Sequence, residues 1–191
     1  MEKMSQEISF VIIAWATDQS KNQDGEFAYC SGHINPIKAI DPGLVYEAFE
    51  EDYIKLMCNI GHAPDSIIVI SGDNSSCPES SQNLPSKDLN YPSMIALVPS
   101  EKSFTVNFHR TEAEVVSPSS RPNVKVVPEV LSFKSLEEKK SFDVTVTGEG
   151  LNTSAMLSKS LVWSDGIHTV RSPIVVHTPR YKRLMWMLIY V

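Results

Sequence analysis

The segment EFAYCSGHINP, residues 26–36, places His33 close to a serine, a cysteine and a glycine. These residue types could form a nucleophilic site, because an imidazole can take the proton from a hydroxyl or a thiol. However, residues as close in sequence as Ser31 and His33 rarely present their side chains to each other, and no neighbouring Asp/His pair would activate Cys30. Two interpretations of His33 therefore stand at this point: a catalytic base, or a structural histidine in a protein whose chemistry lies elsewhere.

The chain has three cysteines, so one thiol is left over if a single disulfide forms. A bond between Cys58 and Cys77 would close a loop of about 20 residues and typically stabilises a protein by about 2–4 kcal/mol. The alternative is a zinc site built from Cys58, His62 and Cys77, but it lacks a fourth ligand and a C-x-x-C pair. The sequence favours the disulfide, and we expect neither a metal nor another cofactor.

Two sequons predict N-glycosylation at Asn74 and Asn152, which lie among turn-forming residues, as in the surface loops of a secreted glycoprotein. The sequence argues against a signal peptide. The apolar run of residues 8–13 is followed by Ala14-Trp15-Ala16, which resembles a cleavage site. A signal peptide needs a longer apolar stretch after a basic segment, and the alternative is the buried side of a helix or strand.

Composition limits the class of partner. The 191 residues are 42% hydrophobic, enough for one moderate core or two small ones. The formal net charge of −6 argues against binding to nucleic acid or to anionic membranes, which needs clustered Lys and Arg. The apolar run at residues 184–191 is far shorter than the ~20 residues of a membrane helix, so no membrane span is expected.

The first half of the chain has a helical pattern. Apolar residues recur at intervals of three and four between Val45 and Ile60, namely at Val45, Phe49, Tyr53 and Leu56. Gly61 follows as a C-terminal cap would. Residues 72–93 are dominated by small, polar and turn-forming types, which predicts a long loop or an interdomain connection.

From Phe104 onward the period becomes two, which predicts short strands of an antiparallel β-sandwich. Pro173 would lie at an edge or a bulge, because proline cannot donate a ladder hydrogen bond. The predicted strands are 104–108, 124–127, 130–133, 142–147, 160–163 and 168–176.

Several strings resemble one family. FAYCSGHINPIKAIDPGLVYEAFEEDYIKLMCNIG is similar to the end of the catalytic domain of plant subtilisin-like serine proteases of the cucumisin-like branch, peptidase family S8. KDLNYPSM, residues 87–94, resembles the start of their C-terminal fibronectin type III-like domain. FTVNFHRT, VVPEVLSFKS, SFDVTVTGEG and LVWSDGIHTVRSPIVV resemble strands of that domain. The resemblance covers residues 14–178 and implies an extracellular, apoplastic protein of the serine-type endopeptidase (hydrolase) family.

The opening segment matches a family pattern, Tyr-Gly-x-Gly-His-x-x-Pro, to which the family assigns no catalytic role. Tyr29, Gly32, His33 and Pro36 match the pattern, whereas Cys30 replaces its first glycine. The resemblance therefore implies that His33 is structural. Cys30 is a departure that would be strained if the backbone there needs a positive φ.

The family's catalytic residues cannot be transferred to this chain. Subtilases carry the Asp, His and Ser of their triad in the contexts Asp-Thr-Gly, His-Gly-Thr-His and Gly-Thr-Ser-Met, with an Asn donating to the oxyanion. None of the three strings occurs in the 191 residues. His109 and His168 lie in strand patterns, His62 follows the helix and His177 ends a strand, so we expect all four to be structural or solvated. The predicted set of catalytic residues is empty.

The resemblance gives a mixed α and β organisation: a short helical tail of a subtilisin-like α/β domain, followed by a fibronectin type III-like antiparallel β-sandwich. The family's protease-associated insert is absent, and Arg110-Thr111 runs directly into an acidic segment where the family has a turn and another strand. We expect an exposed edge or a gap there. The predicted regions are an unmatched N-terminus 1–13, a catalytic-domain remnant 14–71, a linker 72–93, a sandwich 94–178 that is incomplete near 110–116, and an unmatched tail 179–191.

The leading functional hypothesis is a truncated subtilisin-like endopeptidase that is inactive because the triad and the oxyanion Asn are missing. One alternative is a noncatalytic module that binds a protein partner of unidentified kind. Another is a fragment of a full-length protease gene. If the catalytic core is absent, apolar residues such as Phe49, Tyr53 and Leu56 would be left exposed.

Overall fold

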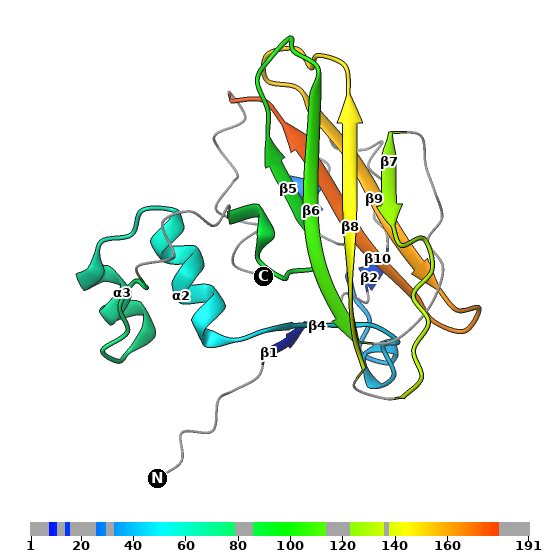
Figure 1. Cartoon of the computed structure of the whole chain (residues 1–191), viewed down its shortest axis with the longest axis horizontal. Helices are drawn as coiled ribbons and strands as arrows, with labels where there is room; N and C mark the ends of the chain where they lie inside the picture. The colour runs from blue at the N-terminus through cyan, green and yellow to red at the C-terminus, as the bar shows by residue number, and fades with distance from the viewer. Residues whose placement is uncertain are drawn as a thin grey trace.

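Two β-sheets face each other, and two helices lie to one side of them (Figure 1). This is seen in a computed structural model, which describes residues 8–10, 14–15, 26–29, 33–78, 86–113, 123–135 and 138–179. Within these residues the chain has the predicted fold class, a mixed α and β protein built around a β-sandwich.

The larger sheet has five antiparallel strands in the order β1-β4-β6-β8-β7. Its longest ladder joins β6 and β8, from Phe104 opposite Gly148 to Ala113 opposite Lys139. Along β8 the exposed and buried residues alternate, because one face of the sheet packs on the core. The strands are β1 (Ile8–Phe10), β4 (Val45–Ala48), β6 (Phe104–Ala113), β7 (Val124–Val127) and β8 (Lys139–Gly148).

The smaller sheet has the order β5-β10-β9, with β5 (Met94–Leu97), β9 (Met156–Ser164) and β10 (Thr169–His177). β10 pairs with β9 in antiparallel fashion and with β5 in parallel fashion, so the sandwich is not purely antiparallel. β10 is the central strand of this sheet, but its ladder to β5 begins only at Ile174, so Pro173 has no described strand partner on that side. This local edge agrees with the prediction for Pro173, because proline cannot donate a ladder hydrogen bond.

The sandwich core lies between the two sheets and is closed by large side chains from both. Phe142 of β8 and Trp163 of β9 meet edge to face, with ring centroids 5.0 Å apart. Val130–Phe133 was predicted as a strand and is not one. Pro128 cannot continue the β7 ladder, so the chain leaves the sheet and Leu131 enters the core from a loop.

A buried hydrogen bond joins the two sheets. The hydroxyls of Tyr46 on β4 and Ser172 on β10 lie 2.8 Å apart, and both side chains are buried. We expect Tyr46→Phe to lower the free energy of unfolding by about 1–2 kcal/mol, because the Ser172 hydroxyl loses this partner without gaining water. Urea denaturation measures the loss. The double variant Tyr46→Phe/Ser172→Ala should lose less than the sum of the two single variants, and strict additivity would contradict the prediction.

The helical prediction for residues 45–60 is correct only from residue 50. Val45–Ala48 form β4, in which Tyr46 and Ala48 are buried, so their alternation matches a strand and outweighs the helical spacing. α2 (Glu50–Asn59) begins after Phe49, whose N–H donates to the Asp52 carboxylate at 3.1 Å. It ends before Gly61, which adopts a φ of +88° and serves as the predicted cap.

α3 (Pro64–Ser71) follows α2 and packs beside it (Figure 1). The expectation of exposed apolar residues was wrong for Leu56, which is buried, and correct for Phe49, which is exposed, while Tyr53 is half-buried. The exposed apolar residues of this part are mainly Ile68, Val69 and Ile70 on α3. The remaining elements are short: β2 (Ala14–Trp15) paired with β3 (His33–Ile34), α1 (Glu26–Tyr29), and two 3-10 turns, η2 (Lys38–Ile40) and η4 (Ser86–Asp88).

Candidate functional site

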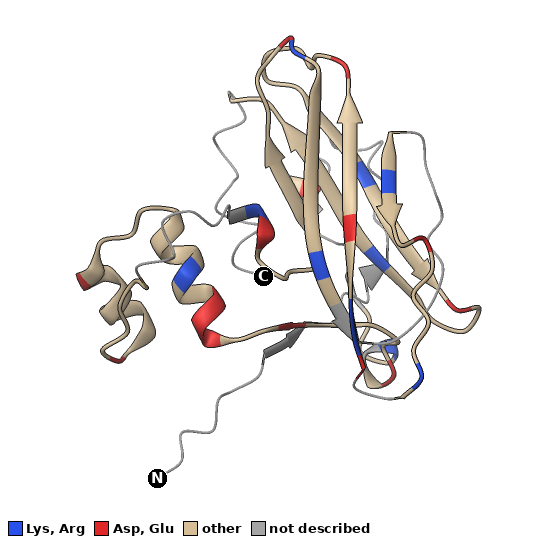
Figure 2. Cartoon of the chain, in the orientation of Figure 1, with Lys and Arg blue, Asp and Glu red and all other residues tan. Residues whose placement is uncertain are grey.

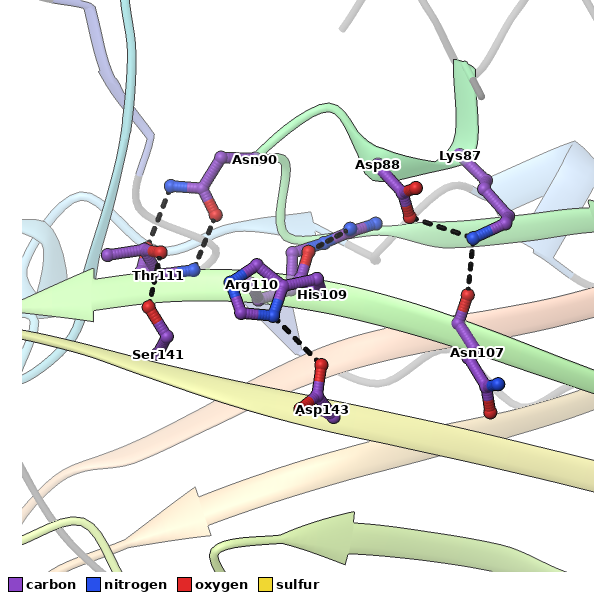
Figure 3. A network of polar contacts seen from close by, with 9 residues as sticks. All are labelled: Lys87, Asp88, Asn90, Asn107, His109, Arg110, Thr111, Ser141 and Asp143. Atoms are coloured by element: carbon purple, nitrogen blue, oxygen red, sulfur yellow. Dashed lines mark hydrogen bonds and ion pairs between the residues drawn. The ribbon is translucent and has the colours of Figure 1, made fainter. Parts of the chain in front are cut away.

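The segment that connects the helices to the sandwich, residues 86–93, lies along one edge of β6; we refer to it as the junction segment (Figure 3). On this edge β4 pairs only with the last two residues of β6, Glu112 and Ala113. Along the rest of this edge no described strand pairs with β6. Backbone groups there still need hydrogen-bond partners, and the junction segment supplies several of them.

Asn90 takes the place of a strand residue beside Thr111. Its Oδ1 accepts from the Thr111 N–H at 2.9 Å, and its Nδ2 donates to the Thr111 carbonyl at 2.7 Å. The same Nδ2 donates to the Glu47 carbonyl of β4 at 2.9 Å. One amide side chain therefore binds the backbones of β4 and β6 at the point where their pairing stops.

Arg110 points from β6 to the backbone of the junction segment and is only 2% exposed. Its Nε donates to the Tyr91 carbonyl at 2.8 Å and its Nη2 to the Ser93 carbonyl at 3.3 Å, while its Nη1 donates to the carbonyl of His109 at 2.7 Å. The guanidinium also lies 5.6 Å from the centroid of the Phe108 ring. Charge-assisted hydrogen bonds of this kind stabilise a buried cation.

Lys87 forms the outer contact of the junction segment. Its Nζ donates to the Asn107 carbonyl at 2.6 Å and lies 2.9 Å from the Asp88 carboxylate (Figure 3). Lys87, Asn90 and Arg110 together fix the direction in which the chain passes from the helices into the sandwich. The groups they bring together are amides, cations and carbonyls, so the arrangement positions backbone and offers no nucleophile.

The histidines with described side-chain partners contact carboxylates or backbone carbonyls. His109 Nδ1 lies 2.8 Å from Asp143 across the β6–β8 ladder, on the surface (Figure 3). His177 is buried at the end of β10, with Nδ1 3.3 Å from the Thr178 carbonyl. His62 follows α2 as predicted. None of the described contacts is a serine–imidazole pair of the kind that acyl transfer uses.

His168 was predicted to lie in a strand, but it lies in the turn just before β10. Its Nδ1 is 2.6 Å from the Asp165 carboxylate and its Nε2 is 3.1 Å from that of Asp41. The Asp165 carboxylate, which accepts a hydrogen bond from the imidazole, and then the Asp41 carboxylate beside Nε2 raise the pKa of His168. The side-chain and backbone hydrogen bonds from His168 lower the pKa of Asp165 to about 2.

The backbone of His33 lies in β3 opposite Trp15, and the other two members of the proposed nucleophilic group, Cys30 and Ser31, lie outside the described residues. Cys58 and Cys77 form a disulfide with their Cα atoms 5.7 Å apart. Because this bond uses both sulfurs, it excludes them as the thiolate ligands of the zinc alternative.

Both sequon asparagines, Asn74 and Asn152, are exposed in loops. The Asn152 carbonyl accepts from the Ala155 N–H, so the second sequon forms a tight turn before β9. Glycosylation of these two residues stays a prediction.

Sequence reasoning missed the roles of Asn90 and Arg110. The string KDLNYPSM was noted as the start of the sandwich, but its contacts with β6 depend on which strand edge lacks a partner. One signal was available: Arg110 occupies a position in the alternating pattern of β6 where a buried apolar residue would be expected.

Comparison with known proteins gives the same architecture. A family described as "Fibronectin type-III domain" matches residues 88–176. The chain is 47% identical over 176 residues to Subtilisin-like protease SBT4.6 of Arabidopsis thaliana, covering 86% of this chain and 24% of that protein. It is 45% identical over 184 residues to Subtilisin-like protease SBT4.3 of the same plant, covering 90% of this chain and 25% of that protein.

The sheets, their core and the family match define residues 88–176 as a β-sandwich of the fibronectin type III class. The identities extend beyond that domain into the helical part, and the chain is a relative of the plant subtilisin-like proteases. It spans about a quarter of the length of the curated relatives that it matches.

Proposed function

We propose that this chain provides the noncatalytic, sandwich-bearing portion of a subtilisin-like protease architecture and does not itself hydrolyse peptide bonds. The observation that carries the proposal is the absence of the Asp-Thr-Gly, His-Gly-Thr-His and Gly-Thr-Ser-Met strings from its 191 residues. Acyl transfer needs a nucleophile, a base and an oxyanion donor in mutual contact. His109, His168 and His177 have carboxylate or carbonyl partners instead, which supports the proposal.

The role that remains is positional. Asn90 donates to the carbonyls of Glu47 and Thr111 and so joins β4, the strand that leads into α2, to β6 of the sandwich. Through this contact the sandwich can hold the start of the helical part in a fixed orientation. We place the protein outside the cell, because disulfides persist in oxidising compartments and the two sequons are exposed. Within the described residues no helix is long and apolar enough to cross a membrane. The described Lys and Arg residues are spread over both sheets and α2 (Figure 2).

We expect purified protein to give no labelling with a serine-directed fluorophosphonate probe and no hydrolysis of casein above a buffer blank. The physical reason is that no described hydroxyl has an imidazole positioned to take its proton. A full-length plant subtilisin-like protease of known activity is the positive control. Turnover that is lost on changing Ser31→Ala or His33→Ala would overturn the proposal and restore the nucleophilic interpretation of the opening segment.

A further inference from the structure

The outer face of the smaller sheet is covered, although one face of such a sheet in a two-layer sandwich ordinarily meets water. In β10, Ile174 and Val176 point into the core. Val175 and His177 alternate with them and point outward. Nevertheless both outward residues are almost fully buried, and His177 is 3% exposed. Another element must lie over this face.

That element is the short helix α1. Phe27 of α1 and Val175 form a buried cluster, and Ile95 of β5 and Met156 of β9 pack against this cluster. Its ring meets the His177 imidazole edge to face, with centroids 5.6 Å apart and planes at 85°. We call Ile95, Met156, Val175 and His177 the covered strip.

A polar contact fastens α1 beside the covered strip. The Glu26 carboxylate is 2% exposed; one oxygen accepts from Arg171 Nη2 at 3.0 Å and the other accepts from the Ser158 hydroxyl. Arg171 lies four residues before Val175 on β10, and Ser158 is the register partner of Val175 on β9, so both side chains belong to the outer face. Helix α1 is therefore attached through one apolar side chain and one charged one.

His177 makes this attachment sensitive to protons. Burial under α1 lowers the pKa of the imidazole, an effect that the Thr178 carbonyl partly opposes. Among the elements packed against it, the charged residues are Glu26 on α1, Lys159 on β9 and Arg171 on β10, while β5 has none. The Glu26 carboxylate binds Arg171 and Ser158, and the contact that His177 makes is with the Thr178 carbonyl.

We propose that α1 is a detachable cover for the covered strip and that acidification releases it by protonating His177. Docked, the imidazole is buried and neutral; released, it is hydrated and binds a proton more readily. The released form binds more protons, so falling pH favours release once it passes below the ordinary histidine pKa of about 6.5. Above that pH, His177 is neutral in both forms and leaves the docking unchanged.

Hydrogen–deuterium exchange of the full chain at pH 7.5 and pH 5.5, corrected for the intrinsic effect of pH on exchange, tests the proposal. We expect the protection of peptides covering α1 to fall at the lower pH, by no more than about tenfold per pH unit for one titrating group. Protection of β8 should stay unchanged, which shows that the sandwich remains folded. Equal protection of α1 at the two pH values would overturn the proposal.

Variants separate this mechanism from general loosening. His177→Leu should remove the pH dependence and keep α1 protected, whereas the surface variant His109→Gln should retain the pH dependence of the unmodified protein. Glu26→Gln should lower α1 protection at both pH values, because it removes the charge that Arg171 binds. If His177→Leu does not fold, His177→Gln serves in its place. A pH dependence that persists without an imidazole at 177 would contradict the proposal.

Discussion

Changing Arg110→Met should lower the free energy of unfolding by about 3 kcal/mol, one of the two largest losses that we expect. Methionine keeps much of the length and the apolar contact with Phe108, but it has no donors. The carbonyls of Tyr91, Ser93 and His109 would each lose a charge-assisted hydrogen bond in a region that water does not reach readily. An unsatisfied buried acceptor costs about 1–3 kcal/mol, and removing a buried charge offsets part of the sum.

Urea denaturation followed by tryptophan fluorescence measures this change, because Trp163 lies in the sandwich core. Arg110→Lys should show an intermediate loss, since an ammonium group keeps the charge but cannot reach three carbonyls in the same geometry. The matched control is Lys125→Met, which removes an exposed cation from β7 and should change stability by less than about 0.5 kcal/mol. A loss for Arg110→Met no larger than that of the control would contradict the role assigned to the junction segment.

The expected loss bears on function as well as on stability. If Arg110 and Asn90 orient the helical part on the sandwich, Arg110→Met should also increase hydrogen exchange in the junction segment itself. Under the proposed function, the chain acts by holding its helical part in a fixed orientation on the sandwich. Loss of that orientation would therefore remove the function.

Strands with one buried face could be predicted from the sequence. In residues 142–147 the apolar residues face the core and the polar residues face outward, because one face of β8 packs on the core. The prediction failed where a segment fits both periods. Val45 and Phe49 have helical spacing, but Tyr46 and Ala48 are buried as strand residues, and tertiary pairing with β1 and β6 decides between the two.

The contacts of the candidate site depend on elements that are distant in sequence, and this limits what a sequence can predict. Asn90 binds Thr111 at a point where no described strand pairs with this edge of β6, and Glu26 binds Arg171 from 145 residues away. A pattern read within a short stretch of sequence cannot predict either contact. Arg110 and His177 are polar residues at buried positions, and such exceptions to the hydrophobic pattern identify sites better than the pattern does.

The second large effect concerns the helical pair. Figure 1 shows α2 and α3 standing to one side of the sandwich, and α3 exposes Ile68, Val69 and Ile70. A pair of short helices with so little buried surface has little stability of its own. The Cys58–Cys77 disulfide restricts its unfolded state, and we expect the double variant Cys58→Ser/Cys77→Ser to lose about 3 kcal/mol of local stability, enough to unfold the pair.

This loss should be local, which distinguishes it from the effect of Arg110→Met. Exchange of amides in α2 and α3 should rise towards the rate of an unstructured peptide, and trypsin should cut at Lys55, while the unfolding midpoint of the sandwich changes little. Cys30→Ser is the matched control, because it removes a thiol without touching the bond. If α2 stays protected in the double variant, packing and not the disulfide holds the helices together. An equal fall in the stability of the sandwich would instead mean that the helices and the sheets unfold as one cooperative unit, joined through the junction segment.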